Sequence, residues 1–357
     1  MRVGNVTVDW VERVLHDAGT IDRTTRVARA DVAPIGTGQV ADSVRIVLDH
    51  VGGTGPASLV AKVSSDDDQS RAAGASELNY LREVRFYQEV APHLAARVAA
   101  CHHAEIDDDG AEFALLLEDL GPARPGDQLV GCTVDETEQV LREAARFHAP
   151  FWGGATLRGS AWLDISATYW PRFESLLPQW FAGFVERYAD RLPAEDLAYA
   201  GEFVAAVSSY YEQLRSAPPT VQHGDLRPDN VLFDVQGVPG TVAVIDWQTV
   251  ILGPAAVDTA VRREHEDRLL DLYHAELVAL GVEDYDRARL EHDYAVGTFA
   301  NLVIGVAAAM LVKRTDRGDE LFCGMVRSAV THARDRDGLA ALGVVPAAGD
   351  VGAVSRA

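Results

Sequence analysis

The residues with the clearest capacity for chemistry lie in the segment 223–230, HGDLRPDN, and at Asp246, which ends an apolar run further along the chain. Phosphoryl transfer needs a carboxylate that accepts the hydrogen of an attacking hydroxyl, and oxygen ligands that hold Mg²⁺ against nucleotide phosphates. Asp225 suits the first role, and Asn230 and Asp246 suit the second. The plainer interpretation is a capped turn followed by a buried Asp. Because Asp225, Asn230 and Asp246 together supply the groups that one reaction needs, the pattern favours a phosphotransfer site.

A second set of residues lies upstream and would hold a nucleotide. Gly36 and Gly38 lie between two predicted strands, where backbone N–H groups would close over phosphates, although a β-hairpin turn is the plainer interpretation. Lys62 lies in an apolar strand and needs a partner, which a phosphate and a helix carboxylate would supply. Glu83 is the preferred carboxylate and Glu77 is the alternative.

The elements that must position these residues follow from the hydrophobic periodicity and the turn signals. The first part of the chain alternates as strands do, and most of the rest has helical periodicity, which predicts an α+β fold. Thr133 or Asp135 would cap the helix that precedes residue 149. We predict strands near 32–35, 43–48, 58–63, 98–106 and 112–117, a polar loop at 66–70, helices at 76–90 and 135–149, helical segments at 169–215 and 261–341, and a β-rich segment at 221–246.

Taken together, these motifs resemble the aminoglycoside phosphotransferase and choline kinase superfamily, and within it the ecdysteroid-kinase-like branch and its bacterial relatives. The HGD…N and IDW motifs are specific, and the glycine loop is less so. The resemblance spans roughly Ile35 to the last helices. The segments that carry it are 83–92 (EVRFYQEVAP), 115–121 (LLLEDLG), 142–153 (REAARFHAPFWG), 223–233 (HGDLRPDNVLF) and 242–248 (VAVIDWQ).

The resemblance implies a bilobal protein-kinase-like fold, with a small β-rich N-terminal lobe, a larger mainly helical C-terminal lobe, and ATP between them. The expected ranges are 1–120 for the nucleotide-binding lobe, 121–345 for the lobe with the catalytic loop and acceptor site, and 346–357 for a tail.

The resemblance also implies roles for single residues. Asp225 would be the catalytic base or the group that orients the hydroxyl, and Asn230 and Asp246 would be the Mg²⁺ ligands. Glu118 and Leu120 would offer backbone contacts to adenine, and His223 and Asp258 would hold the catalytic loop.

Composition limits the partners. The formal net charge is −22, with 54 acidic against 32 basic residues, which argues against nucleic acid and anionic membranes as partners. The N-terminus shows no export signal, and we interpret Ala295–Val312 as a buried core helix rather than a membrane span. Three widely separated cysteines fit a reducing cytoplasm. We expect a cytoplasmic monomer or homodimer.

The best hypothesis is therefore an ATP-dependent phosphotransferase that acts on a hydroxyl of a small molecule. A nucleotide-binding pseudokinase is the alternative, and a protein kinase is disfavoured because only residues 248–257 separate Asp246-Trp247 from Asp258. Aromatic residues between Trp162 and Tyr188 favour a hydrophobic alcohol as acceptor, whereas acids such as Glu264, Glu266 and Asp267 would suit a cationic aminoglycoside.

Overall fold

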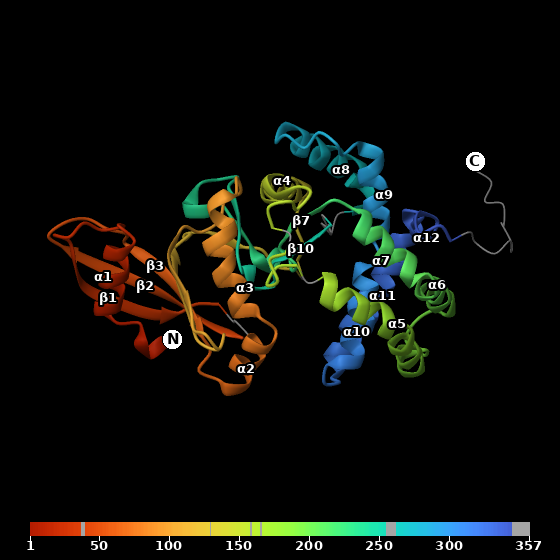
Figure 1. Ribbon diagram of the computed structural model, residues 1–357, viewed down its shortest axis with the longest axis horizontal. Coiled ribbons are helices and arrows are strands. Elements are labelled where there is room, and N and C mark those ends of the chain that lie inside the picture. The colour runs from red at the N-terminus through yellow and green to blue at the C-terminus, as the bar shows by residue number, and fades with distance from the viewer. Residues whose placement is uncertain (37–39, 129, 158, 165, 255–261, 345–357) are drawn as a thin grey trace. The chain divides into compact units, whose positions relative to one another are not determined.

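The computed structural model describes residues 1–36, 40–128, 130–157, 159–164, 166–254 and 262–344 (Figure 1). These residues form two units. Unit 1 holds the described residues of Met1–Asp164, Val221–Leu252 and Val257–Val282, and unit 2 holds those of Ile165–Thr220, Gly253–Ala256 and Glu283–Ala357. The lobe boundaries expected from the sequence stay a prediction.

A five-stranded antiparallel sheet, counted over the described residues, dominates the first part of unit 1 in the order β1-β2-β3-β5-β4. In β3, Leu59, Ala61 and Val63 alternate with the residues between them and are buried on one face, so Lys62 lies on the opposite face. The strands are β1 (Arg26–Pro34), β2 (Ala41–Val51), β3 (Ser58–Ser64), β4 (Cys101–Ile106) and β5 (Phe113–Glu118).

Helix α1 (Val8–Asp17) covers the buried face of this sheet (Figure 1). Thr7 caps the helix by accepting a hydrogen bond from the N–H of Trp10. Val11 and Leu15 are completely buried and belong to the same core cluster as the buried side chains of β2, β3 and β5. The apolar face of α1 therefore completes the core beneath the sheet.

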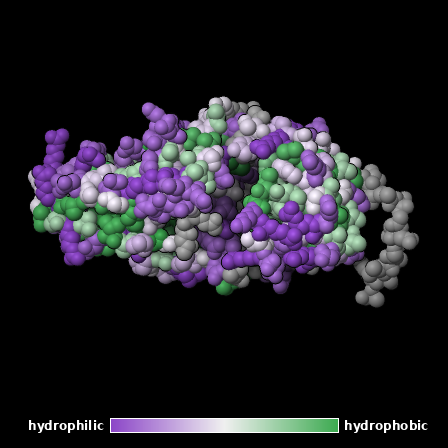
Figure 2. All heavy atoms as spheres, turned by 90° about the horizontal axis from the view of Figure 1, so that it is seen from below, coloured by the Kyte–Doolittle hydropathy of each residue, from purple (hydrophilic) through white to green (hydrophobic). Residues whose placement is uncertain are grey.

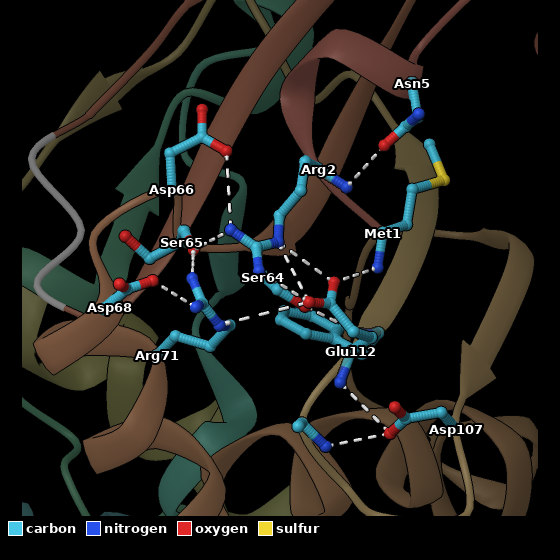
Figure 3. Close-up of polar contacts among 12 residues, drawn as sticks. Met1, Arg2, Asn5, Ser64, Ser65, Asp66, Asp68, Arg71, Asp107 and Glu112 are labelled. Carbon is cyan, nitrogen blue, oxygen red and sulfur yellow. Dashed lines mark hydrogen bonds and ion pairs between the residues drawn. The ribbon is translucent and has the colours of Figure 1, made fainter.

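The N-terminal segment is held on the edge of this core by charge pairs (Figure 3). The Met1 ammonium group is 2.6 Å from Oε2 of Glu112, and Arg2 donates to both carboxylate oxygens of the same side chain. Arg2 and Arg71 both donate to the carbonyl oxygen of Ser65. Hydrogen bonds from Arg2 are the main reason that the pKa of Glu112 falls to about 2.

The helical region after β3 differs from the prediction. A separate helix, α2 (Asp68–Ser76), begins inside the predicted polar loop, because Asp67 caps it by accepting from the N–H of Ser70. Leu78 has a left-handed backbone with φ of 61°, which separates α2 from α3 (Asn79–Arg85). A π-helical stretch, η2 (Phe86–Val90), continues α3.

The β-rich segment near residue 230 packs against α4 (Val134–His148). Thr133 caps α4 and forms a capping box with Glu136. Thr133 is one of the two residues predicted as the cap, and Asp135 is the other. Val231 and Phe233 of β8 pack with Val242 of β9 in a small core. The remaining elements that lie in or border unit 1 are η1 (Val3–Asn5), η3 (Ala91–His93), β6 (Arg124–Pro125), η4 (Ala149–Phe151), β7 (Pro219–Gln222), η5 (Pro228–Asn230), β8 (Val231–Phe233), η6 (Val235–Gly237), β9 (Val242–Val244), η7 (Trp247–Thr249), β10 (Ile251–Pro254) and α8 (Arg262–Ala279).

The described part of unit 2 is helical. Its core gathers aromatic side chains from several helices, and Phe184, Tyr188, Phe203 and Phe299 are completely buried there. The hydroxyl of Tyr188 donates to Asp319 at 2.7 Å. The helices are α5 (Ser166–Tyr188), α6 (Ala194–Ala205), α7 (Val207–Ser216), α9 (Arg287–Gly297), α10 (Ala300–Leu311), α11 (Asp316–Asp335) and α12 (Gly338–Ala341).

One helical stretch in the described residues, Arg287–Leu311, is long and apolar enough to cross a membrane, with a hydropathy of 1.8. Its apolar window is 56% buried within the protein, and Leu302 and Val306 of α10 belong to the core of unit 2. This packing agrees with the interpretation of Ala295–Val312 as a core helix.

The architecture confirms the predicted α+β class, with a sheet in the first part of the chain and helices in the later part. Hydrophilic residues, with smaller hydrophobic areas between them, cover much of the face seen in Figure 2. Cys101, Cys132 and Cys323 are all free thiols, as the sequence predicts.

Candidate functional site

Lys62 lies between two carboxylates that come from distant parts of unit 1. Its Nζ is 2.6 Å from Oε2 of Glu83 and 2.8 Å from Oδ1 of Asp246. Strand β3 carries Lys62, helix α3 carries Glu83, and Asp246 immediately precedes η7. The exposed fraction of the side chain is 13% for Lys62 and only 2% for Glu83. Glu77, the alternative carboxylate, is exposed at the end of α2.

Burial and charge act against each other in this cluster. Burial disfavours the charged ammonium of Lys62, but the carboxylates of Glu83 and Asp246 outweigh it and raise the pKa of Lys62. Burial, with help from Asp246, raises the pKa of Glu83 to about 6 against the attraction of Lys62 and a hydrogen bond from the backbone N–H of Trp247. Lys62 therefore keeps its charge near neutral pH, whereas Glu83 loses its charge in mildly acidic solution.

Asp225 and Asn230 contact each other on the loop before β8. The Asn230 side-chain nitrogen donates to the Asp225 carbonyl oxygen at 2.8 Å and to its Oδ2 at 3.0 Å. Arg227 lies in the same loop, with Nε 3.2 Å from Oδ2 of Asp225, and it also donates to Gln128. Burial raises the pKa of Asp225, and Arg227 opposes this shift. Asp225 is thus a stronger base than an ordinary Asp, next to a positive charge.

His223 connects this loop to the strand that precedes Asp246. Its Nε2 is 2.9 Å from the carbonyl oxygen of Ile245, and its Nδ1 accepts the N–H of Asp225 at 3.3 Å. These two bonds require a neutral imidazole with its hydrogen on Nε2. Burial lowers the pKa of His223 to about 4, so the neutral form predominates. This geometry supports the structural role expected for His223, while Asp258 lies outside the described residues.

Gly224 allows the turn between His223 and Asp225. Its φ is +80°, and a Cβ added there would lie 2.2 Å from the carbonyl oxygen of Thr249. The hydroxyl of Thr249 donates to the carbonyl oxygen of His223 at 2.9 Å. The two loops that carry Asp225 and Trp247 therefore pack directly against each other, and only glycine fits at the contact.

Asn230 and Asp246 are chemically suited to hold Mg²⁺. The side-chain nitrogen of Asn230 is engaged by Asp225, while no described residue donates to its oxygen. Asp246 has a left-handed backbone with φ of 64°, and 33% of its side chain is exposed. Mg²⁺ prefers such oxygen ligands and completes its shell with waters and nucleotide phosphates. Among the described residues, no group of three or more His, Cys, Asp or Glu forms an all-protein metal site.

The residues expected to contact adenine lie at the end of β5. The Glu118 carboxylate is bound by Arg97 at 2.7 Å and by the side chain of Gln236 at 2.8 Å. The backbone N–H of Gln236 donates to the carbonyl oxygen of Leu120 at 3.0 Å. Sequence reasoning missed Gln236, which lies in the β8–β9 hairpin and has a left-handed backbone with φ of 55°. The neighbouring Gly237 marks a turn but gives no sign of a contact with β5.

The predicted glycine loop is described only in part. Gly36 has φ of +70° and open space around its Cα, as a tight turn requires. Gly38 lies outside the described residues, so a phosphate cradle at this loop stays a prediction.

Comparison with known proteins identifies the family. The profile of the family described as "Phosphotransferase enzyme family" matches residues 31–290. The chain belongs to this family. The predicted superfamily is thereby confirmed, and the phosphotransferase class with it, while the ecdysteroid-kinase-like branch stays a prediction. No curated protein matches the chain.

Comparison with solved structures finds two proteins that share the fold at low sequence identity, and a third that is more distant. A microcompartment-associated aminopropanol kinase is 14% identical, with 93% of this chain and 99% of that chain covered and a TM-score of 0.53. The GDP and kanamycin complex of an APH(2'')-IIIa enzyme is 15% identical, with 90% and 98% covered and a TM-score of 0.50. A choline kinase from Cryptosporidium parvum is 9% identical, with 95% and 98% covered and a TM-score of 0.49.

Proposed function

We propose that this phosphotransferase transfers the terminal phosphoryl group of a Mg²⁺-bound nucleoside triphosphate, expected to be ATP, to a hydroxyl of a small molecule. The observation that supports this most strongly is the ion-pair cluster of Lys62, Glu83 and Asp246, whose Nζ–O distances are 2.6 and 2.8 Å. A buried lysine held between two carboxylates provides a fixed positive charge for phosphate oxygens. Asp246 would then share its carboxylate between Lys62 and the metal ion.

The second part of the proposal concerns the acceptor hydroxyl. Asp225 would accept its hydrogen, because burial raises the pKa of this carboxyl and Asn230 orients it at 3.0 Å. Asn230 and Asp246 would hold Mg²⁺, which when bound neutralises charge on the phosphates. Arg227, 3.2 Å from Asp225, adds a second positive charge beside the carboxylate. Gly36, Gly38, Glu118 and Leu120 would complete the nucleotide site.

Most of the aromatic side chains that the sequence suggested for the acceptor site belong to or pack against the core of unit 2. Phe184 and Tyr188 are core residues, and Trp170, Phe173, Trp180 and Phe181 pack against that core while partly buried, so most of these rings serve folding. Among the acids, Glu264 is exposed but Glu266 is buried, so Glu266 presents no surface charge to a cationic acceptor. The test must therefore use a panel of alcohols, beginning with aminopropanol and kanamycin because of the two neighbours named above.

The experiment is a coupled ADP-release assay with Mg·ATP and amino alcohols, aminoglycosides, sugars, sterols and terpenols. We expect one class to accelerate ADP release, and Asp225→Asn to reduce this rate by about 10²–10⁴-fold while ADP binding persists. The matched control is Asp108→Asn in the exposed turn between β4 and β5, which should keep the full rate. An Asp225→Asn enzyme with the wild-type rate would overturn the assignment of Asp225. Binding of nucleotide without turnover on any acceptor would favour the pseudokinase.

A further inference from the structure

Two side chains of α3 are buried without the partners that their chemistry requires. Asn79 is 7% exposed, and its side chain makes no hydrogen bond to any residue in the described part of the chain. Arg82 is 8% exposed, pairs with no carboxylate of the described residues, and makes only a long hydrogen bond among them, from Nε to the carbonyl oxygen of Trp162 at 3.4 Å. None of the free polar atoms of Asn79 and Arg82 is completely enclosed, so they open onto a space that a ligand can reach.

Asn79 and Arg82 lie on one face of α3. They are three positions apart, which makes them neighbours on the surface of the helix. Glu83, the next residue, is turned by about 100° around the helix axis and contacts Lys62 at 2.6 Å. The partner that Arg82 lacks therefore lies apart from the Lys62 cluster, although the two sites are adjacent along the chain.

The backbone that Arg82 contacts is joined to the segment that follows Asp246. Trp162 is the first of the aromatic residues that the sequence suggested for the acceptor site, and its carbonyl oxygen accepts from Arg82. The next residue, Leu163, accepts the N–H of Leu252 at 3.0 Å. Leu252 belongs to β10, which comes directly after η7 and Asp246. The free groups on α3 are thus connected to the proposed phosphotransfer site through backbone on two sides.

We propose that Asn79 and Arg82 bind an oxyanion, which is a carboxylate or phosphate group carried by the acceptor. A buried positive charge without a partner is costly, and a bound anion removes this cost. A guanidinium presents paired N–H donors to two oxygens of a carboxylate or phosphate, and the amide of Asn79 adds a further donor. The inference rests on the proposed function, because it assigns part of the acceptor of that reaction. Free inorganic phosphate offers the same chemistry, so the experiment separates the two sources.

The first measurement is thermal unfolding of the full-length chain while inorganic phosphate replaces chloride at constant ionic strength. We expect phosphate to raise the Tm of the wild type, because an anion that binds only the folded protein stabilises it. Arg82→Met keeps the apolar stem without the charge and should lose most of this rise. Asn79→Ala should weaken phosphate binding by about tenfold, the effect of one hydrogen bond to a charged group.

The matched control for this titration is Arg85→Met on the same helix. The side chain of Arg85 is 46% exposed and pairs with Glu89, so the response of this variant to phosphate should equal that of the wild type. An equal rise of Tm in the wild type and in Arg82→Met would overturn the site, because phosphate would then bind elsewhere, as at Lys62.

The second measurement identifies the source of the anion. The coupled ADP-release assay compares acceptors with and without an anionic group, which are glycerol 3-phosphate against glycerol and 3-hydroxybutyrate against butane-1,3-diol. We expect an anionic acceptor to accelerate ADP release. Arg82→Met should raise its KM by at least about tenfold with little change in kcat, because a group away from the reacting hydroxyl is bound equally in the ground and transition states.

The outcomes separate this inference from the proposed function. Turnover of neutral acceptors alone, or of an anionic acceptor with the same KM in Arg82→Met, would overturn the anionic acceptor and leave the phosphotransferase standing. A rise of Tm with phosphate that Arg82→Met abolishes, without turnover of an anionic acceptor, would assign the site to the free anion. Absence of turnover with every acceptor would count against the proposed function, and the phosphate titration would still decide whether Asn79 and Arg82 bind an oxyanion.

Discussion

The indole ring of Trp247 stacks on the ring of Phe86, with centroids 4.0 Å apart and an interplanar angle of 8°. Both side chains are completely buried. Phe86 follows Glu83 on the same helical stretch, and Trp247 directly follows Asp246. The stack therefore joins the two backbone segments whose carboxylates hold Lys62, so packing and electrostatics maintain the same geometry.

We expect Phe86→Ala to destabilise the protein by about 3–5 kcal/mol, because it removes a buried aromatic ring and leaves a cavity. ADP affinity should also fall, since Glu83 and Asp246 lose their shared support. Phe86→Leu keeps most of the volume without the ring, so it should destabilise the protein less than Phe86→Ala does. Urea unfolding and ADP titration measure the two effects. Wild-type ADP affinity in a folded Phe86→Ala variant would contradict a positioning role for the stack.

The pKa of Glu83 gives a prediction about pH. Because burial raises this pKa to about 6, Glu83 is charged above pH 6 and becomes neutral below it. As the pH falls through about 6, Lys62 loses one of its two carboxylate partners, and kcat/KM should decline. Glu83→Gln should have a lower kcat/KM at pH 7.5, and its kcat/KM should not decline further as the pH falls through about 6. Comparing the ratio of the two enzymes at each pH cancels the titration of the nucleotide itself. A constant ratio between pH 5 and pH 8 would disprove the assignment.

His148 provides a separate prediction for stability. It is 1% exposed and shares a 2.6 Å hydrogen bond with Tyr273, and burial lowers its pKa from 6.5 to about 3. The unfolded chain therefore binds a proton between these values that the folded protein does not bind. Stability from this group is complete above pH 6.5 and falls as the pH decreases, by about 1.4 kcal/mol per pH unit within the window. His223 acts in the same direction down to about pH 4.

The measurement is urea unfolding at pH 7.5, 6.0 and 5.0 for the wild type and for His148→Gln. The variant should be less stable at pH 7.5 but should lose stability more slowly as the pH falls, because Gln does not titrate. Parallel curves for the two proteins would show that His148 does not contribute to the acid sensitivity.

Gly224 yields a prediction with an internal control. Gly224→Ala places a Cβ 2.2 Å from the carbonyl oxygen of Thr249 at a φ of +80°, so the loop that carries Asp225 must move. Gly240 has a similar φ of +76° with no atom within 4 Å of an added Cβ. Gly240→Ala should cost only the left-handed strain of about 1–2 kcal/mol and keep full activity. Gly224→Ala should in addition lose most of its kcat. Equal turnover in the two variants would show that the contact with Thr249 is unimportant.

Local spacing explains which parts of the site the sequence could predict. Asp225 and Asn230 lie five residues apart on one loop, so their contact at 3.0 Å follows from chain connectivity. The contact of Lys62 with Glu83 and Asp246 could be predicted only from the resemblance to a known family, in which these motifs occur in the same order. No local sequence pattern connects the three residues. Glu83 rather than Glu77 makes the contact because Leu78 turns the chain between α2 and α3.

Other features could not be predicted, because backbone groups rather than side-chain types produce them. The contact of Gln236 with Leu120 is made by a backbone N–H, a group that every residue except proline has. It also depends on the positive φ of Gln236, which is uncommon for residues other than glycine. Helix α2 was missed because Asp67 and Asp68 are typical of both a polar loop and a helix start.

The pair of Lys62 and Asp246 also has a consequence for how the chain folds. The two residues are separated by 184 positions in the sequence, whereas Asp225 and Asn230 are separated by 5. Contacts between distant positions require the closure of long loops, and this makes them form late in folding. During refolding, we therefore expect the catalytic loop to take shape before the lysine cluster assembles. Recovery of nucleotide binding should lag behind recovery of secondary structure.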